Sequence, residues 1–191
     1  MRTITRLAAV STMALATTVG LAGPALAEDY ECRGTVAAVT LVGNVIVPDD
    51  AVCTLNGTHV QGNIVVKSRS TLNATDVTAT GGLQGESPST VVVRGSAFGN
   101  SISLRKAELG NGQIEISSTQ VTGDVQFEEN RNPIRLENND ITGSVQANKN
   151  TGGLEITGNR IGNGLQCQDN RPAPLGGDNI AKQKQGQCQF L

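Results

Sequence analysis

Short pairs of apolar residues recur along the chain, each pair separated by one polar residue and bounded by Gly, Asn, Thr or Asp. Three segments with this pattern, 114–130, 134–150 and 154–170, align without gaps at a period of 20 residues. Alternation of apolar and polar residues over a few positions is typical of β-strands, and the bounding residues are typical of turns. The repeat therefore predicts several short strands per 20 residues, with tight turns between them.

The apolar positions of the repeat continue toward the N-terminus with small insertions. One equivalent position holds Val60, Val77, Phe98, Val121, Ile141 and Ile161, and another, five residues earlier, holds Leu55, Leu72, Val93, Ile116, Leu136 and Ile156. A third position, four residues after the first, holds Ile64, Ile102, Val125, Val145 and Leu165. Leu83 joins this third series if two residues are inserted before it. Self-similarity at a fixed period indicates a solenoid.

We therefore predict an all-β protein with a single parallel β-helix, or solenoid, of about 20 residues per coil and about seven to eight coils. Equivalent strands of successive coils would stack at about 4.8 Å around a column of aliphatic side chains. A right-handed winding is favoured because parallel crossover connections are overwhelmingly right-handed. The coils are expected over residues 41–170, with an N-terminal cap at 28–40 and a C-terminal loop and cap at 171–191.

Residues 1–27 have the pattern of a secretory signal peptide, in which a cationic start precedes an apolar stretch and a pair of small residues at a cleavage site. Ala25 and Ala27 are the small residues. A membrane anchor is the alternative, but Gly23-Pro24 breaks a helix soon after a short apolar run. We expect a secreted, extracellular protein with no membrane span after cleavage.

The four cysteines, Cys32, Cys53, Cys167 and Cys188, all follow this segment. An even number in an exported chain suggests two disulfides, for which three pairings exist. Both Cys32–Cys53 and Cys167–Cys188 span 21 residues, which is about one coil, and stacked positions lie within disulfide reach. We therefore predict these two bonds, one at each end, where a solenoid needs a cap against edge-to-edge aggregation.

Composition narrows the range of functions. Aromatic residues make up 2% of the chain, there is one His, and the net charge is −2. Aromatic platforms for sugars or bases, Cys/His metal clusters and a basic nucleic-acid footprint are therefore not expected. We expect no nucleic-acid partner, no cofactor and no metal.

The outward positions of the strands determine the chemistry of the surface. One predicted column consists of Glu115, Arg135 and Glu155, and another consists of Gln126, Gln146 and Gln166. Charged neighbours in a column can pair across strands, and identical amides can bond up a stack. A turn column of Asn130, Asn150 and Asn170 is expected to be buried and to satisfy backbone groups of the turns. Structural roles are therefore favoured for these columns, and a binding strip is the alternative.

The early coils carry aliphatic residues at outward positions, namely Ile46, Val65 and Val92. Exposed aliphatic side chains on neighbouring coils can form a partner or self-association surface. The alternative is that they only fill a partly covered face.

The recurring Asn139-Asp-Ile-Thr-Gly143, with the variant Asn159-Arg-Ile-Gly-Asn163, resembles the right-handed β-helix repeats of the pectate-lyase-like superfamily. The run from Gly164 to Pro174, which contains Cys167 and Asn170, is similar to small secreted actinobacterial β-helix proteins of unassigned function. The superfamily resemblance implies polysaccharide lyase or hydrolase activity in enzymatic members, which use clustered or paired Asp residues.

No such cluster is evident in this sequence. Asp76 and Asp140 are expected to share an outward position, but three coils apart, and Asp124 is flanked by Ser101 and Ser144 in its column. We therefore predict an exported, non-enzymatic solenoid that acts as a structural or binding surface. Its partner would be cell-envelope polysaccharide or a second copy of itself. The alternative is a small polysaccharide-active lyase or hydrolase.

Overall fold

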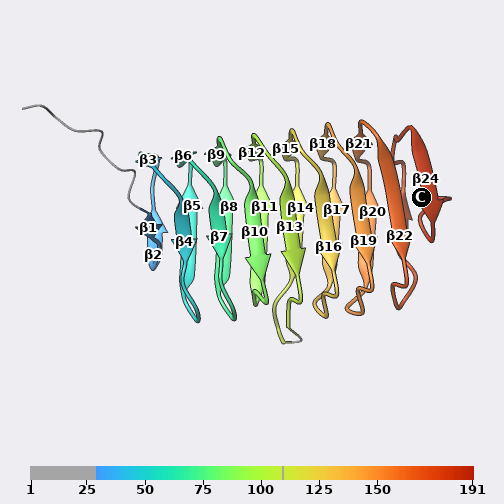
Figure 1. The fold of residues 1–191 in the computed structure, drawn as a ribbon, viewed down its shortest axis with the longest axis horizontal. Helices are drawn as coiled ribbons and strands as arrows, with labels where there is room; N and C mark the ends of the chain where they lie inside the picture. The colour runs from blue at the N-terminus through green and yellow to red at the C-terminus, as the bar shows by residue number, and fades with distance from the viewer. Residues whose placement is uncertain (1–28, 109) are drawn as a thin grey trace, which may run out of the picture.

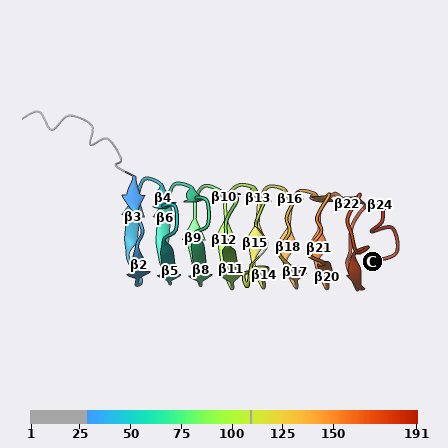
Figure 2. The same ribbon diagram turned by 90° about the horizontal axis from the view of Figure 1, so that it is seen from below.

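The computed structural model describes residues 29–108 and 110–191, so the expected signal peptide at 1–27 lies outside the described residues. The described chain forms strands that stack into three parallel sheets, and it contains no helix. Successive coils follow one another along a rod (Figures 1 and 2). The predicted parallel β-solenoid is confirmed, with about eight turns.

Each coil contributes one strand to each sheet. Sheet A contains β1 (Tyr30–Glu31), β4 (Val45–Val47), β7 (Ile64–Val66), β10 (Leu83–Glu86), β13 (Ile102–Arg105), β16 (Val125–Glu128), β19 (Val145–Asn148), β22 (Gly164–Gln168) and β24 (Gln183–Gly186). Sheet B contains β2 (Gly34–Val36), β5 (Val52–Asn56), β8 (Thr71–Thr75), β11 (Thr90–Arg94), β14 (Ile114–Ser117), β17 (Ile134–Glu137), β20 (Leu154–Thr157) and β23 (Leu175–Gly177). Sheet C contains β3 (Thr40–Val42), β6 (His59–Gln61), β9 (Thr78–Ala79), β12 (Ala97–Phe98), β15 (Gln120–Val121), β18 (Asp140–Ile141) and β21 (Arg160–Ile161).

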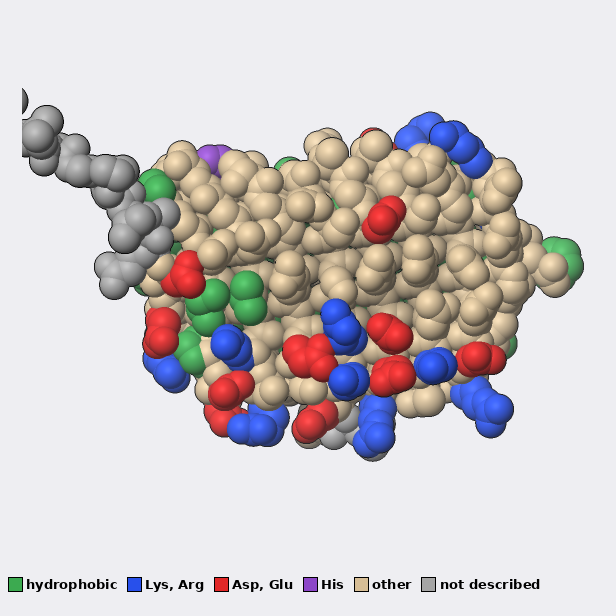
Figure 3. Space-filling model, in the orientation of Figure 1, with side chains coloured by type: hydrophobic (Ala, Val, Ile, Leu, Met, Phe, Trp, Pro, Cys, Tyr) green, Lys and Arg blue, Asp and Glu red, His purple; other side chains and the backbone are tan. Residues whose placement is uncertain are grey.

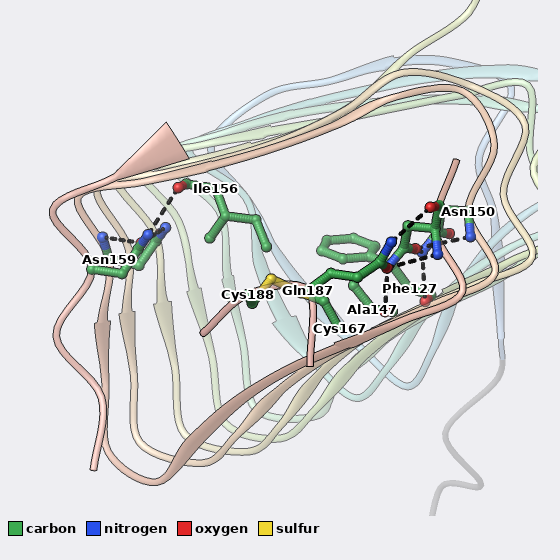
Figure 4. The surroundings of a disulfide bond; sticks show 10 residues. Phe127, Ala147, Asn150, Ile156, Asn159, Cys167, Gln187 and Cys188 are labelled. Atoms are coloured by element: carbon green, nitrogen blue, oxygen red, sulfur yellow. Dashed lines mark hydrogen bonds between the residues drawn. A yellow bond between two sulfur atoms is a disulfide. The ribbon is translucent and has the colours of Figure 1, made fainter. Parts of the chain in front are cut away.

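The chain passes from sheet A to sheet B to sheet C in every coil. In Figure 4 the labelled Ala147, Asn150, Ile156 and Asn159 follow one another counter-clockwise, while the N-terminal coils lie behind. The winding is therefore right-handed, as predicted. Early coils repeat every 19 residues and late coils every 20, as the pairs Asn44–Asn63 and Asn130–Asn150 show. The coil between them is longer, because the connection from β13 to β14 is eight residues long.

Aliphatic side chains fill the interior of the coils, and the two largest fully buried side chains are Phe98 and Phe127. Alternate strand residues are buried, so the four-residue strands of the middle coils, such as β16, β17 and β19, direct two side chains into the core. This narrow interior agrees with the scarcity of aromatic residues, since a column only a few side chains wide is filled by aliphatic side chains.

The register of one coil differs from the sequence-based alignment. Val60 pairs with Ala79, and Ala79 pairs with Phe98, so Ala79 holds the inward position that Val77 was expected to hold. Leu83 then follows Ala79 by the same interval that separates Ile64 from Val60, and the predicted insertion is wrong. Val77 is instead buried in the turn before Ala79, between sheets B and C, where its backbone N–H donates to Ser96 of the next coil.

The same shift applies to sheet B, where Leu55 pairs with Ala74 rather than with Leu72. Size misled the alignment, because it favoured the larger apolar residue at each step. Ala79 lies directly beside Phe98, and a small residue next to a ring keeps the core at its normal packing density.

Both predicted disulfides are present. Cys32 and Cys53 have Cα atoms 5.4 Å apart, and Cys167 and Cys188 have Cα atoms 5.3 Å apart. All four side chains are buried inside the terminal coils. The segments 28–40 and 171–191, which were expected to form caps, also contribute strands β1, β2, β23 and β24 to the ends of the sheets.

Candidate functional site

Two buried ladders of polar side chains run along the turns of the solenoid. In the turn between sheets A and B, Oδ1 of Asn150 accepts hydrogen bonds from the backbone N and Nδ2 of Asn130, at 3.0 and 2.9 Å. Nδ2 of Asn150 donates to the Phe127 carbonyl and to Oδ1 of Asn170. Figure 4 shows how this ladder ends, with the Gln187 amide bonded to Asn170 next to the Cys167–Cys188 disulfide.

The turn between sheets B and C contains the second ladder, whose members are Ser96, Thr119, Asn139, Asn159 and Asn179. Each side-chain oxygen accepts the backbone N–H of the preceding coil, and every member is at most 4% exposed. These contacts satisfy backbone groups that would otherwise be buried without a partner. The expected structural role of the Asn columns is confirmed.

The Gln column on the outer face of sheet A has the opposite character. Gln126, Gln146 and Gln166 are in register across β16, β19 and β22, as predicted, and Gln185 of β24 continues the column. None of the three predicted residues makes a side-chain hydrogen bond to another described residue. The expectation that these amides bond up the stack is therefore wrong. Their donors and acceptors point into solvent.

We call this surface the amide face, defined by Gln84, Ser103, Gln126, Gln146, Gln166 and Gln185. Figure 3 shows a broad area over sheet A that is largely free of charged side chains, with one acidic side chain inside it and many charged side chains along its lower border. Apolar side chains lie on this view near β4 and β7. The face is therefore mostly neutral, and it follows the long axis of the rod.

Two grooves indent the amide face. One has a volume of about 390 Å³ and lies beside Gln146, Gly164, Gln166 and Gln185. The other has a volume of about 590 Å³ and lies beside Val65, Gln84, Ser103 and their neighbours. Both are shallow and open, which suits an extended ligand better than an enclosed small molecule.

The aliphatic residues proposed as an interface separate into two places. Ile46 and Val65 pair with each other at the N-terminal end of the Gln column and are half-buried. Val92 lies on sheet B, between Asn73 and Glu115, and is 6% exposed. A single surface containing all three residues is therefore ruled out, and only Ile46 and Val65 are neighbours.

The charged column on sheet B has the predicted register, since Glu115 pairs with Arg135 and Arg135 with Glu155. Arg135 forms an ion pair with Glu155 at 3.2 Å, whereas Glu115 receives two hydrogen bonds of 2.7 Å from Arg94. A groove of about 360 Å³ runs beside the column and is closed on one side by Pro172 and Leu175. The charges of this column are largely neutralised within the protein.

The Asp residues considered as catalytic candidates do not cluster, whereas Glu137 and Glu155 both contact Arg135, at 3.5 and 3.2 Å. Thr78, not Asp76, occupies the column of Asp140, so these two Asp residues do not share a position. Asp124 lies between Ser101 and Ser144 as predicted, and its Oδ1 accepts the Ser144 N–H at 2.7 Å. Among residues 29–108 and 110–191, no group of three or more His, Cys, Asp or Glu side chains is placed to hold a metal ion.

An electrostatic effect on a carboxyl group is found at an exposed turn, at Asp50. Arg69 donates two hydrogen bonds to Asp50, at 2.7 and 2.8 Å, and these lower the pKa of Asp50 below its ordinary value.

The described part of the chain contains no helix long and apolar enough to cross a membrane.

Sequence reasoning missed the groove at Gly164, because the absence of a side chain in one column is visible only once the neighbouring coils are in place. It also missed Gln185, which belongs to a segment read as a closing cap. A 19-residue offset from Gln166 was the available signal.

Comparisons with protein-family models, with curated proteins and with solved structures found no match to this chain.

Proposed function

We propose that this protein is an exported, non-enzymatic solenoid that binds an extended polysaccharide of the cell envelope along its amide face. The observation that carries the proposal is the column of unpaired Gln amides that repeats once per coil on a mostly neutral surface. It would resemble the small secreted actinobacterial β-helix proteins to which its C-terminal run is similar.

Amide chemistry suits this ligand. Each Gln side chain offers one carbonyl acceptor and two N–H donors, and sugar hydroxyls both donate and accept. Because aromatic stacking is absent, the affinity per sugar unit would be low, and repetition along the rod would raise the overall affinity. The column extends over β16, β19, β22 and β24, which spans about 14 Å at 4.8 Å per strand.

The two disulfides suggest an oxidising, extracellular setting, which agrees with export. The non-enzymatic part of the proposal is supported by the separation of Asp76, Asp124 and Asp140. Asp140 stands between Gln120 and Arg160 in its column, so neither neighbour is a carboxylate that could share acid–base work with it. The lyase or hydrolase alternative would need such a pair.

Binding to insoluble neutral polysaccharides, cellulose and chitin among them, tests the proposal with the oxidised chain. We expect retention that falls at least tenfold in the triple variant Gln126→Ala, Gln146→Ala, Gln166→Ala. The matched control is Glu115→Ala, Arg135→Ala, Glu155→Ala on sheet B, which should bind as the unmodified protein does. Thermal unfolding of both variants checks that the fold is retained.

Loss of retention in the sheet B variant alone would place binding on the charged column and overturn the proposal. Release of reducing ends or unsaturated products during the incubation would favour the enzymatic alternative. Failure to retain any polysaccharide, together with concentration-dependent dimers in sedimentation, would instead support self-association through Ile46 and Val65.

A further inference from the structure

The groove at the C-terminal end of the amide face is formed by residues of neighbouring coils around Gly164. It exists because Gly164 occupies a column in which the next coil carries Gln183 and the previous coil carries Ser144. A side chain at Gly164 would meet only the Gln183 carbonyl oxygen, at 3.8 Å, so open space lies above the backbone there. The amides of Gln146 and Gln166 line one side of this space.

A positive charge lies on the rim of the same groove. Lys182 lines it, and its Nζ donates to Oδ1 of Asn163 at 3.1 Å. Within the described chain, neither Lys182 nor the nearby Arg160 forms an ion pair, although Arg160 is beside Asp140 in its column. Lys and Arg side chains gather at this end of the rod in Figure 3.

The carboxylate nearest to Gly164 along its own column is Asp124, which lies two coils away. One of its oxygens is already held by the Ser144 N–H. The groove therefore combines neutral amides with a cation that lacks a carboxylate partner, on a protein whose overall charge is negative. An uncompensated ammonium at the rim favours an anion that reaches it.

We infer that the groove at Gly164 holds one unit of the bound polysaccharide that carries an anionic substituent, a carboxylate or a sulfate or phosphate ester. The inference rests on the proposed function and makes it more specific. The Gln amides bind the hydroxyls of this unit, and the Lys182 ammonium binds its charged group. The remaining amide face binds neutral units.

Pairs of polymers with the same backbone, one with anionic and one with neutral substituents, provide the test. Carboxymethylcellulose is compared with hydroxyethylcellulose, and dextran sulfate with dextran, in affinity electrophoresis of the oxidised chain. We expect about tenfold tighter binding of the anionic member at low ionic strength, and a smaller preference in 0.5 M salt because surface charge is screened. The two anionic arms separate carboxylate from ester recognition.

Two variants locate the effect. Lys182→Gln should remove the preference for anionic polymers and leave binding of hydroxyethylcellulose unchanged. Gly164→Gln should fill the groove and weaken binding of carboxymethylcellulose at least fivefold. Its matched control is Gly177→Gln on sheet B, where a new Cβ meets nothing within 4 Å.

Equal binding of charged and neutral polymers, or an unchanged preference in Lys182→Gln, would overturn the inference and leave the proposed function intact. Retention of neither polymer would overturn both. An unchanged affinity in Gly164→Gln, with thermal unfolding like that of the Gly177→Gln control, would also reject the groove as the binding site.

Discussion

Gln146 and Asn150 carry the same amide group and lie four residues apart in one coil, yet their surroundings are opposite. Asn150 is 1% exposed and its amide bonds to Asn130, Phe127 and Asn170. Gln146 lies on the outer face, and its amide has no partner among the described residues. The difference shows that a repeated amide column indicates structure only where it is buried, and leaves a surface free for ligands where it is not.

The largest effect is expected from Asn150→Ala. This change removes the acceptor of the buried Asn130 backbone N–H, one of the two acceptors of Asn130 Nδ2, and a donor to the Phe127 carbonyl, and a buried unsatisfied group costs about 1–3 kcal/mol. We expect a loss of about 3–5 kcal/mol in the free energy of unfolding, measured by urea denaturation. A loss below 1 kcal/mol would contradict the structural role of the ladder.

The second largest loss of stability is expected at the C-terminal end of the first ladder, at Asn170. Replacing Cys167 and Cys188 by Ala opens a 21-residue loop and should cost about 3 kcal/mol, plus the freed Gln187 cap on Asn170. The control is the Cys32 and Cys53 double variant, which leaves the Gln187 contact with Asn170 intact. Equal losses in urea denaturation would show that the cap adds nothing.

Thr119→Asn should extend the run of Asn residues in the second ladder by one coil. Oγ1 of Thr119 receives the Ser96 N–H at 3.4 Å, whereas Oδ1 of Asn139 receives the Thr119 N–H at 2.9 Å. A shorter bond and an added donor should raise the free energy of unfolding by about 0.5–1.5 kcal/mol. Lower stability than the unmodified protein would mean that the larger side chain does not fit this turn.

Gln146→Ala is the counterpart of Asn150→Ala on the surface. Because its amide has no protein partner, the free energy of unfolding should change by no more than about 0.5 kcal/mol. Urea denaturation of the two variants side by side tests the comparison directly. A large loss in Gln146→Ala would show that the Gln column also stabilises the fold.

The smallest effect is expected at the exposed pair Asp50 and Arg69. The pKa of Asp50 is lowered by hydrogen bonds from Arg69, so its contribution is present above the ordinary pKa and is lost as the pH falls through the lowered pKa. Asp50→Asn should remove this slight acid dependence of unfolding. Arg69→Gln should remove it equally, because the pair acts together, and an unaltered pH profile in either variant would contradict it.

Much of the fold could be predicted from one sequence because the repeat places equivalent residues one coil apart. The 21-residue spacing of Cys32 and Cys53, about one coil, predicted their disulfide, although Cys53 is in register with Gly34, two residues after Cys32. The inward position of Phe98 followed from its column in the repeat. The alignment failed at Val77 and Leu72, where it used residue size as a guide, although a narrow core needs small residues beside large ones.

The surface was less predictable. The Gln and Glu–Arg–Glu columns were identified, but Val92 was assigned to the wrong neighbourhood, because the sheet on which an outward residue lies depends on the coil register. Which amides bond to each other was also not predictable. A Gln side chain on a flat face has space to turn toward solvent, whereas an Asn in a tight turn is surrounded by backbone groups that need partners.

By itself, the sequence determined the solenoid and its two disulfides, since both follow from local alternation and a fixed period. Its right-handed winding followed from the general preference of parallel crossovers. Only the tertiary structure decided that the Gln amides are free, that Gly164 opens a groove between Ser144 and Gln183, and that Lys182 stands at its rim without an ion pair. These features arise between coils. They depend on which side chains from different coils lie next to one another, and only the register of the stacked coils determines this.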